Sequence, residues 1–223
     1  MTRKLKSDRR GPSSGGKPRS AVVFVHGYGA DGSDLLGLAD PLGPHLPDTV
    51  FFAPDAPEKC TANPFGYQWF PIPWLDGSSD AQALAGLQQS SADLDAFVDG
   101  ILADEGLDAS ALALVGFSQG TMMSLNIAPR RAHPLAGVVG FSGRLMQPEK
   151  LVEDTVSKPP VLLIHGDQDD VVPPTCLPEA ADALVAAGFE TYSHVSKGTA
   201  HGIAHDGLSL ALSFLREKLP MGN

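Results

Sequence analysis

The residues best suited to nucleophilic chemistry lie in one pentapeptide, GFSQG, at residues 116–120. A Gly-x-Ser-x-Gly pattern alone is weak evidence in a chain with 24 glycines. Here the pattern follows an apolar run, Ala111–Val115, and opens a helical pattern, Gln119–Ala128. A serine at such a strand-to-helix turn has strained backbone geometry and presents its hydroxyl at the positive end of a helix. This context favours a nucleophile over an ordinary turn serine, so Ser118 is the predicted nucleophile.

A serine nucleophile needs a histidine base and an orienting carboxylate, which follow in the chain order Ser, Asp, His when the serine occupies such a turn. The segment HGDQDDVVP follows the apolar run Val161–Ile164 and offers three carboxylates: Asp167, Asp169 and Asp170. An aspartate beside a glycine at a strand exit is commonly a turn residue that bonds its own backbone, which is the alternative role for Asp167. Asp169 lies further out, where it could reach a histidine. Residue types alone do not choose among the three.

The base is expected after the last strand. Residues 198–202, GTAHG, follow the predicted strand Glu190–Val195, and their small side chains leave His201 room to approach Ser118. His205 is the alternative, but it lies beside Asp206 at the start of a predicted helix, where a capping or surface role suffices. The remaining histidines are expected to be structural or exposed: His26, His45, His133, His165 and His194.

Ester cleavage also needs N–H donors for the oxyanion that forms on the carbonyl. The residue after the nucleophile, Gln119, supplies one backbone amide at a helix start. The second is expected from the turn after the predicted strand Ala21–Val25, where Tyr28 lies between two glycines. A phosphate-binding loop is the alternative reading of this turn, but G-x-G-x-x-G and a Lys-Ser/Thr ending are both missing from it. Nucleotide binding is therefore not predicted.

Residues 65–74 hold five of the 15 aromatic side chains and both tryptophans. Three prolines in and beside this stretch make it a loop rather than a helix. An aromatic loop beside a nucleophilic serine suggests the wall of an acyl pocket, with Trp69 and Phe70 as substrate-binding residues. Packing of the same loop in the core is an equally good interpretation.

The elements that must position these residues alternate between short apolar runs and helical patterns. Most of the predicted strands are continuous Val/Ile/Leu/Phe runs, which is typical of parallel strands covered on both faces. The predicted strands are Ala21–Val25, Val50–Phe52, Ala111–Val115, Gly137–Phe141, Val161–Ile164 and Glu190–Val195. The predicted helices are Asp80–Ala103, Gln119–Ala128, Cys176–Ala187 and Asp206–Leu219. The alternation predicts an α/β fold with one mostly parallel sheet in a single domain.

The charge is unevenly distributed. Seven of the 16 basic residues lie in residues 1–20, which hold one acid, whereas the remainder carries nine basic and 25 acidic residues. The excess negative charge of residues 21–223 repels the phosphate backbone of nucleic acids, which argues against nucleic acid as a partner. Residues 1–20 are rich in Gly, Ser and Pro and lack an apolar core of a signal peptide, so we expect a flexible basic tail before a catalytic domain at 21–223. No apolar run is long enough to span a bilayer, so no stable membrane insertion is expected.

Taken together, the motifs resemble the phospholipase/carboxylesterase family of α/β-hydrolases, which includes bacterial carboxylesterases and acyl-protein thioesterases. The resemblance rests on HGYGADGSDL (26–35), FGYQWF (65–70), GFSQG, HGDQDDVVP (165–173) and GTAHG. It implies an α/β-hydrolase fold with helices on both faces of the sheet and no large cap domain. It also implies hydrolysis of carboxylic esters or thioesters without a metal or cofactor, with Asp169 as the acid and His201 as the base. Tyr28 stands where the family usually has leucine, but the expected role needs only its backbone.

The leading hypothesis is a cytoplasmic serine carboxylesterase that acts on small to medium acyl esters, with a small-molecule ester as its partner and a homodimer as a possible assembly. The two cysteines cannot form a disulfide scaffold, and a reducing compartment is the expectation. A lysophospholipase or an acyl-protein thioesterase would use the same chemistry. A catalytically inactive ligand receptor or interaction module is the alternative of another class, but an intact Ser–Asp–His set argues against it.

Overall fold

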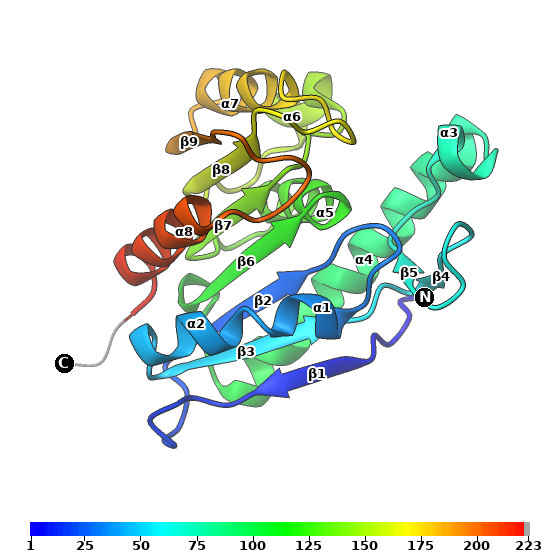
Figure 1. The fold of residues 1–223 in the computed structure, drawn as a ribbon. Coiled ribbons are helices and arrows are strands. Elements are labelled where there is room, and N and C mark those ends of the chain that lie inside the picture. Colours follow the sequence, from blue (N-terminus) through cyan, green and yellow to red (C-terminus); the bar gives the residue numbers. More distant parts are fainter. Residues whose placement is uncertain (221–223) are drawn as a thin grey trace.

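The computed structural model describes residues 1–220, which form a seven-stranded sheet in the order β1-β3-β2-β6-β7-β8-β9 (Figure 1). All neighbouring strands are parallel except β1, which runs antiparallel to β3. The strands are β1 (Ser7–Arg10), β2 (Ser20–Val25), β3 (Thr49–Pro54), β6 (Leu112–Phe117), β7 (Gly137–Phe141), β8 (Val161–Gly166) and β9 (Thr191–Ser196). A separate two-stranded ribbon pairs β4 (Glu58–Lys59) with β5 (Tyr67–Gln68). The predicted mostly parallel sheet is confirmed.

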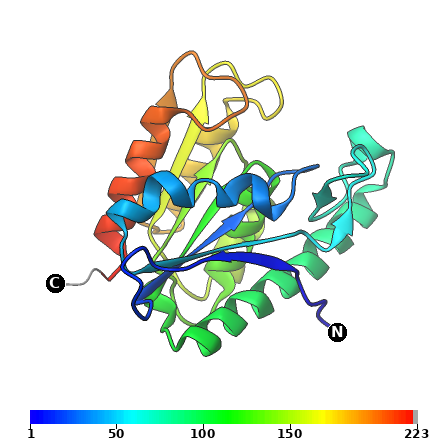
Figure 2. The ribbon, with the colours of Figure 1, turned by 60° about the horizontal axis from the view of Figure 1, so that its bottom comes forward.

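Helices cover both faces of the sheet, as Figures 1 and 2 show. The helices are α1 (Gly32–Leu36), α2 (Ala39–Leu42), α3 (Pro73–Asp76), α4 (Asp80–Glu105), α5 (Gln119–Ile127), α6 (Leu151–Asp154), α7 (Cys176–Ala186) and α8 (His205–Lys218). The four helices predicted from the sequence are present within a few residues of their expected ends, and the short helices α1, α2, α3 and α6 were not foreseen. No helix within residues 1–220 is both long and apolar enough to cross a bilayer.

Two hydrophobic cores lie on opposite faces of the sheet because alternate strand residues point to opposite sides. On one face, β2 residues such as Val23 pack with α4, α5 and α7. On the other face, β2 residues such as Phe24 pack with α1, α2 and α8. Every residue of β2, β3, β7 and β8 is buried. This is why the central strands appear in the sequence as continuous apolar runs rather than alternating ones.

The long helix α4 begins and ends where its capping residues require. Ser79 and Gln82 form a capping box at its start, and Gly106 adopts the left-handed conformation after its end. Gly86 lowers helix propensity, yet a Cβ there would lie 2.7 Å from the Pro71 side chain. The glycine therefore lets the segment after β5 pack directly against the helix.

The N-terminal residues correct the prediction of a flexible tail over residues 1–20. Strand β1 pairs with β3 along four residues, and Leu5 is buried in the core. The basic side chains bind acidic residues of the body, as in the Arg9–Glu105 contact of 2.9 Å and the Arg3–Asp93 contact of 2.7 Å. The sheet therefore begins before residue 21. The charge that suggested a solvated tail instead complements the acidic surface of the domain.

Candidate active site

The loops that follow β2, β6, β8 and β9 carry the predicted active-site residues except Gln119, which is the first residue of α5, and Trp69 and Phe70. Because these strands are parallel, their carboxyl ends meet at one edge of the sheet, where ligands bind in open α/β sheets. The helices α5 and α8 begin at the same edge. Residues that are distant in the sequence are thereby brought to one place.

Ser118 occupies a strained turn between β6 and α5. Its φ of 53° and ψ of −115° lie outside the regions that side-chain-bearing residues prefer. Its amide donates a 2.8 Å hydrogen bond to the Phe141 carbonyl of the neighbouring strand, which holds the turn in place. A Cβ at Gly116 would lie 2.5 Å from the Gly120 carbonyl, and one at Gly120 would lie 1.8 Å from the Val25 carbonyl. Both glycines of the pentapeptide are thus required for β2, β6 and α5 to meet at this distance.

Asp169 is buried and bound on both carboxylate oxygens. Its Oδ1 accepts hydrogen bonds from the amides of Val171 (3.0 Å) and Val172 (2.9 Å). Its Oδ2 lies 2.8 Å from Nδ1 of His201. Burial alone would raise the pKa of this carboxyl group, but the hydrogen bonds from His201 and the two amides outweigh burial and hold the pKa below its usual value. The side chain is therefore a carboxylate at neutral pH.

The three candidate acids have different partners. Asp167 accepts a 2.6 Å hydrogen bond from the amide of Gly198, so it ties its own loop to the loop of His201 rather than bonding its own turn. Asp170 is exposed, and within residues 1–220 its carboxylate takes part in no hydrogen bond or ion pair. Of the three, Asp169 is the one whose carboxylate meets a histidine, as the family resemblance implied.

His201 lies in a loop held close to the end of β8. A Cβ at Gly166 would lie 2.1 Å from the Thr199 carbonyl, and the amide of Gln168 donates a 3.0 Å hydrogen bond to the same carbonyl. The imidazole packs against Phe117, the residue before Ser118, with 4.9 Å between ring centroids. Because Nδ1 faces Asp169, Nε2 is the ring nitrogen left to exchange a proton. His205 is instead the exposed first residue of α8.

The turn after β2 lies directly against the serine. A Cβ at Gly27 would lie 3.3 Å from the Ser118 Cβ, which puts the neighbouring amide of Tyr28 at this edge of the sheet. The amide of Gln119 lies at the first position of α5, where no carbonyl of the helix can accept its hydrogen bond. Within the described residues neither amide donates to another backbone group. Burial of the Tyr28 hydroxyl raises the pKa of this phenol.

Trp69 and Phe70 are not placed to line a pocket, which corrects that prediction. Trp69 is 0 % exposed and Phe70 4 % exposed, and both belong to the core. The Gln119 side chain holds them there: Oε1 accepts from the Trp69 amide and Nε2 donates to the Phe70 carbonyl, each at 2.8 Å. The indole N–H of Trp69 donates a 3.0 Å hydrogen bond to the carbonyl of His26, next to Gly27. This segment therefore connects the nucleophile turn to the turn of Tyr28.

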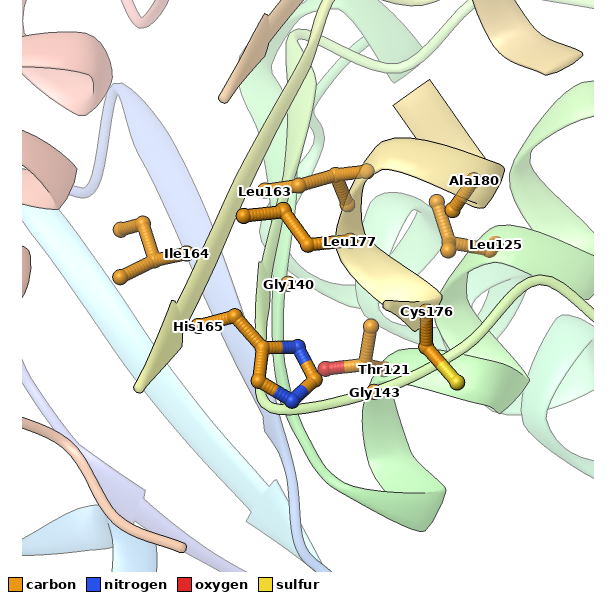
Figure 3. Close-up of a pocket in the computed structure, with 10 residues that line it drawn as sticks. All are labelled: Thr121, Leu125, Gly140, Gly143, Leu163, Ile164, His165, Cys176, Leu177 and Ala180. Atoms are coloured by element: carbon orange, nitrogen blue, oxygen red, sulfur yellow. The ribbon is translucent and has the colours of Figure 1, made fainter. Parts of the chain in front are cut away.

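Two buried histidines have contacts that the sequence did not reveal. His26 accepts a 2.9 Å hydrogen bond from the Ala56 amide at Nε2, and its Nδ1 lies 2.7 Å from the Gly27 carbonyl. His165 lies beside Asp169 and lines a cavity of about 10 Å³ shown in Figure 3. The spacing of His165 and Asp169, four residues apart across a strand exit, is the signal that could have suggested their contact. No group of three or more His, Cys, Asp or Glu side chains in residues 1–220 is arranged to hold a metal ion.

The chain is similar to known esterases and thioesterases over nearly its whole length. The model of the phospholipase/carboxylesterase family matches residues 12–219. Esterase YpfH of Escherichia coli is 26% identical and the match covers 97% of this chain and 90% of YpfH. Acyl-protein thioesterase 1 of Saccharomyces cerevisiae is 30% identical, with 90% and 93% covered. The crystal structure of esterase PE8 is 45% identical with a TM-score of 0.91, and covers 97% of this chain and 100% of that one.

The match of the family model over nearly the whole chain confirms the resemblance that the motifs carried, and the likeness to PE8 confirms an α/β-hydrolase fold. Residues 55–79, between β3 and α4, form the ribbon β4–β5, α3 and connecting loops, and within residues 1–220 no large cap domain covers the sheet edge. Sequence, fold and site geometry lead to the same assignment: this chain belongs to the phospholipase/carboxylesterase family.

Proposed function

We propose that this carboxylic ester hydrolase cleaves small to medium acyl esters through an acyl-enzyme formed on Ser118. His201 is the general base and acid, Asp169 orients and charges the imidazole, and the amides of Tyr28 and Gln119 stabilise the oxyanion. The observation that carries the proposal is the 2.8 Å contact of a buried carboxylate with His201 at the edge where the strained Ser118 turn lies.

In the acylation step, Ser118 Oγ attacks the carbonyl carbon while its proton passes to Nε2 of His201. The carbonyl π electrons move to the oxygen, and the two amides stabilise its negative charge by donating hydrogen bonds to it. Collapse of this tetrahedral species breaks the bond to the alcohol, which leaves with the proton from His201. In deacylation a water molecule repeats the sequence, so that the acid is released and Ser118 is regenerated.

Asp169 supports the charge that forms on His201 in each transition state. The carboxylate is already ionised and bound by two amides, so it needs no rearrangement when the imidazolium appears. Because this charge develops only along the reaction path, the contact is expected to raise kcat more than it lowers KM.

The experiment that tests the proposal combines a substrate panel with active-site labelling. p-Nitrophenyl esters of increasing acyl length should be hydrolysed, and a fluorophosphonate should label Ser118 once. Ser118→Ala should lower kcat by about 10³–10⁶ without unfolding the protein. Ser124→Ala, at a buried serine further along α5, is the matched control and should keep labelling and turnover. Turnover by Ser118→Ala, or labelling elsewhere, would refute the assignment.

A thioesterase or lysophospholipase activity uses the same steps with another leaving group. The 30% identity to acyl-protein thioesterase 1 of Saccharomyces cerevisiae favours testing it. A palmitoyl thioester and a lysophospholipid added to the panel distinguish the three substrate classes by relative kcat/KM. An inactive receptor would bind esters without turning over any of them.

We further propose a cytoplasmic location, a small-molecule ester as the partner, and a homodimer as the assembly, with no role in nucleic-acid binding. Both cysteines are free thiols in the structure, which agrees with a reducing compartment. Light scattering of the purified protein tests the assembly, and fractionation of cells tests the location.

A further inference from the structure

A second histidine contacts the carboxylate that orients His201. The Nε2 of His165 lies 3.2 Å from Oδ2 of Asp169, the same oxygen that faces Nδ1 of His201 at 2.8 Å. It also lies 2.9 Å from the carbonyl oxygen of Val172. The side chains of His165 and Asp169 are almost fully buried, at 2% and 0% exposed, so water does not screen this contact.

The partners of His165 fix which ring nitrogen bears the proton. A carbonyl oxygen and a carboxylate oxygen are both acceptors, so the nitrogen that faces them must be a donor. His165 is therefore protonated at Nε2, and this N–H donates to the carbonyl of Val172, whose own amide binds Oδ1 of Asp169. The carboxylate has three N–H donors, the amides of Val171 and Val172 on Oδ1 and His201 on Oδ2, and Nε2 of His165 lies 3.2 Å from Oδ2 without a hydrogen bond to it.

The remaining surroundings of His165 are mostly apolar. Its ring lines the cavity of Figure 3 together with Thr121, Cys176 and apolar residues of β8 and α7. The cavity volume, about 10 Å³, is at the lower limit of the space that one water molecule needs. The titratable groups that face this cluster are Asp169, His201 and the thiol of Cys176, and burial raises the pKa of that thiol. Arg144 and Glu179 act on the same thiol from outside the cavity.

We propose that His165 is a positioning residue for ester hydrolysis, which fixes Val172 through its Nε2–H and so holds Asp169, and with it His201, in orientation. The inference rests on the proposed function of the Ser118 site. His165 acts through Asp169 and touches no reacting atom.

Two effects follow from the hydrogen bond of His165 to Val172 and from its position beside Oδ2. The hydrogen bond from His165 to Val172 fixes the backbone whose amide binds Oδ1, which keeps Oδ2 of Asp169 in line with Nδ1 of His201. The same N–H lies 3.2 Å from Oδ2 and offsets part of its negative charge, which leaves less of that charge to stabilise a protonated His201. Loss of the donor should therefore lower kcat and also move the acid limb of the kcat/KM profile toward higher pH.

The test compares two replacements of similar length. His165→Met removes the N–H, whereas His165→Gln keeps one, because the Gln Nε2 lies as many bonds from the backbone as the His Nε2. For His165→Met we expect kcat on a p-nitrophenyl ester to fall by about 10–100-fold, the usual scale for outer partners of an active group, with little change in KM. The acid limb should shift upward in pH. His165→Gln should recover most of kcat and the wild-type limb.

A double-mutant cycle with Asp169→Asn shows whether His165 works through the carboxylate. If it does, His165→Met should cost little further activity once the carboxylate is gone. Nitrogen-15 NMR of the imidazoles supplies a readout without turnover: wild type and Ser118→Ala should both show His165 protonated at Nε2. The melting temperature of each variant identifies one that has simply lost its fold, and His165→Gln then carries the test.

Each outcome has a distinct meaning. If wild type is active and His165→Met has the same kcat and the same pH profile, the inference is overturned, but the proposed function is not. The inference is also overturned if the double variant loses as much activity as the product of the two single losses. Such independence would mean that His165→Met has a purely structural effect, which does not depend on the carboxylate. A wild type that hydrolyses no ester or thioester overturns the proposed function instead, while the NMR tautomer still tests the contact.

Discussion

At the scale of single residues, the loop after β8 shows how position decides the role of identical side chains. Asp169 is buried between two amides and His201, Asp167 binds the amide of Gly198, and Asp170 faces solvent. The sequence could narrow the acid to these three but could not choose, because each contact depends on how two loops from different strands approach one another. The family resemblance supplied the choice.

Substitutions of Asp169 and Asp170 should therefore have different effects on kcat. Asp169→Asn is expected to lower kcat by about 10³–10⁴, because a neutral amide cannot stabilise the imidazolium. Asp170→Asn, the matched control in the same loop, should leave kcat nearly unchanged. Steady-state assays on one p-nitrophenyl ester decide between them. A large loss for Asp170→Asn with an active Asp169→Asn would mean that another carboxylate orients the base.

The two candidate bases after β9, His201 and His205, give a second comparison. His201→Ala should be nearly inactive at every pH, whereas His205→Ala should keep most of the activity. In wild type and in His205→Ala, kcat/KM should fall toward acid pH, since a protonated imidazole cannot accept the serine proton. Profiles of kcat/KM against pH measure both. An active His201→Ala beside an inactive His205→Ala would transfer the role of base.

At the scale of elements, the sequence predicts best where one element is defined by its own residues. The strands β6, β7 and β8 are continuous apolar runs, and α4 carries its own capping box, so all of them are foreseen. Strand β1 has the sequence SDRR, and nothing in those four residues indicates a sheet edge. Its stability comes from pairing with β3 and from acidic partners far along the chain. The burial of Trp69 depends likewise on Gln119, 50 residues away.

The attachment of the N-terminal segment to α4 is testable through Arg3. The guanidinium contacts the buried carboxylate of Asp93 and the side chain of Glu58. Arg3→Ala should lower the free energy of unfolding by about 1–3 kcal/mol, because a buried charged acceptor loses a donor. Lys4→Ala, at an exposed neighbour, should change it by less than about 0.5 kcal/mol. Urea unfolding measures both, and equal stability of the two variants would contradict the structural role of Arg3.

At the scale of the whole molecule, the stability of the fold should depend on pH through His26. Burial lowers the pKa of this histidine below the ordinary 6.5, and its Nε2 must stay unprotonated to accept from Ala56. As pH falls below about 6.5, His26 binds a proton in the unfolded chain but stays neutral in the folded chain. The free energy of unfolding therefore decreases. Above that pH, His26 is neutral in both the folded and the unfolded state, so it does not make the free energy of unfolding depend on pH.

Replacing His26 with a residue that does not titrate should therefore flatten the pH dependence. For His26→Gln we expect the free energy of unfolding to change less between about pH 7 and pH 5 than in wild type, by up to about 1.4 kcal/mol per pH unit. His133→Gln, at an exposed histidine, should keep the wild-type slope. Denaturant unfolding at several pH values measures the slopes. Identical slopes in wild type and His26→Gln would contradict the prediction.

Because Trp69 is buried between the two turns of the site, its fluorescence can report on changes there. The chain has two tryptophans, and the other, Trp74, is 73% exposed. Trp74→Phe would leave a single tryptophan, whose backbone amide donates to Gln119 and whose indole N–H donates to the carbonyl of His26. Its emission should be that of a dry environment, at short wavelength. Any inhibitor or substrate that shifts either turn would then be visible as a change in emission, without a coloured leaving group.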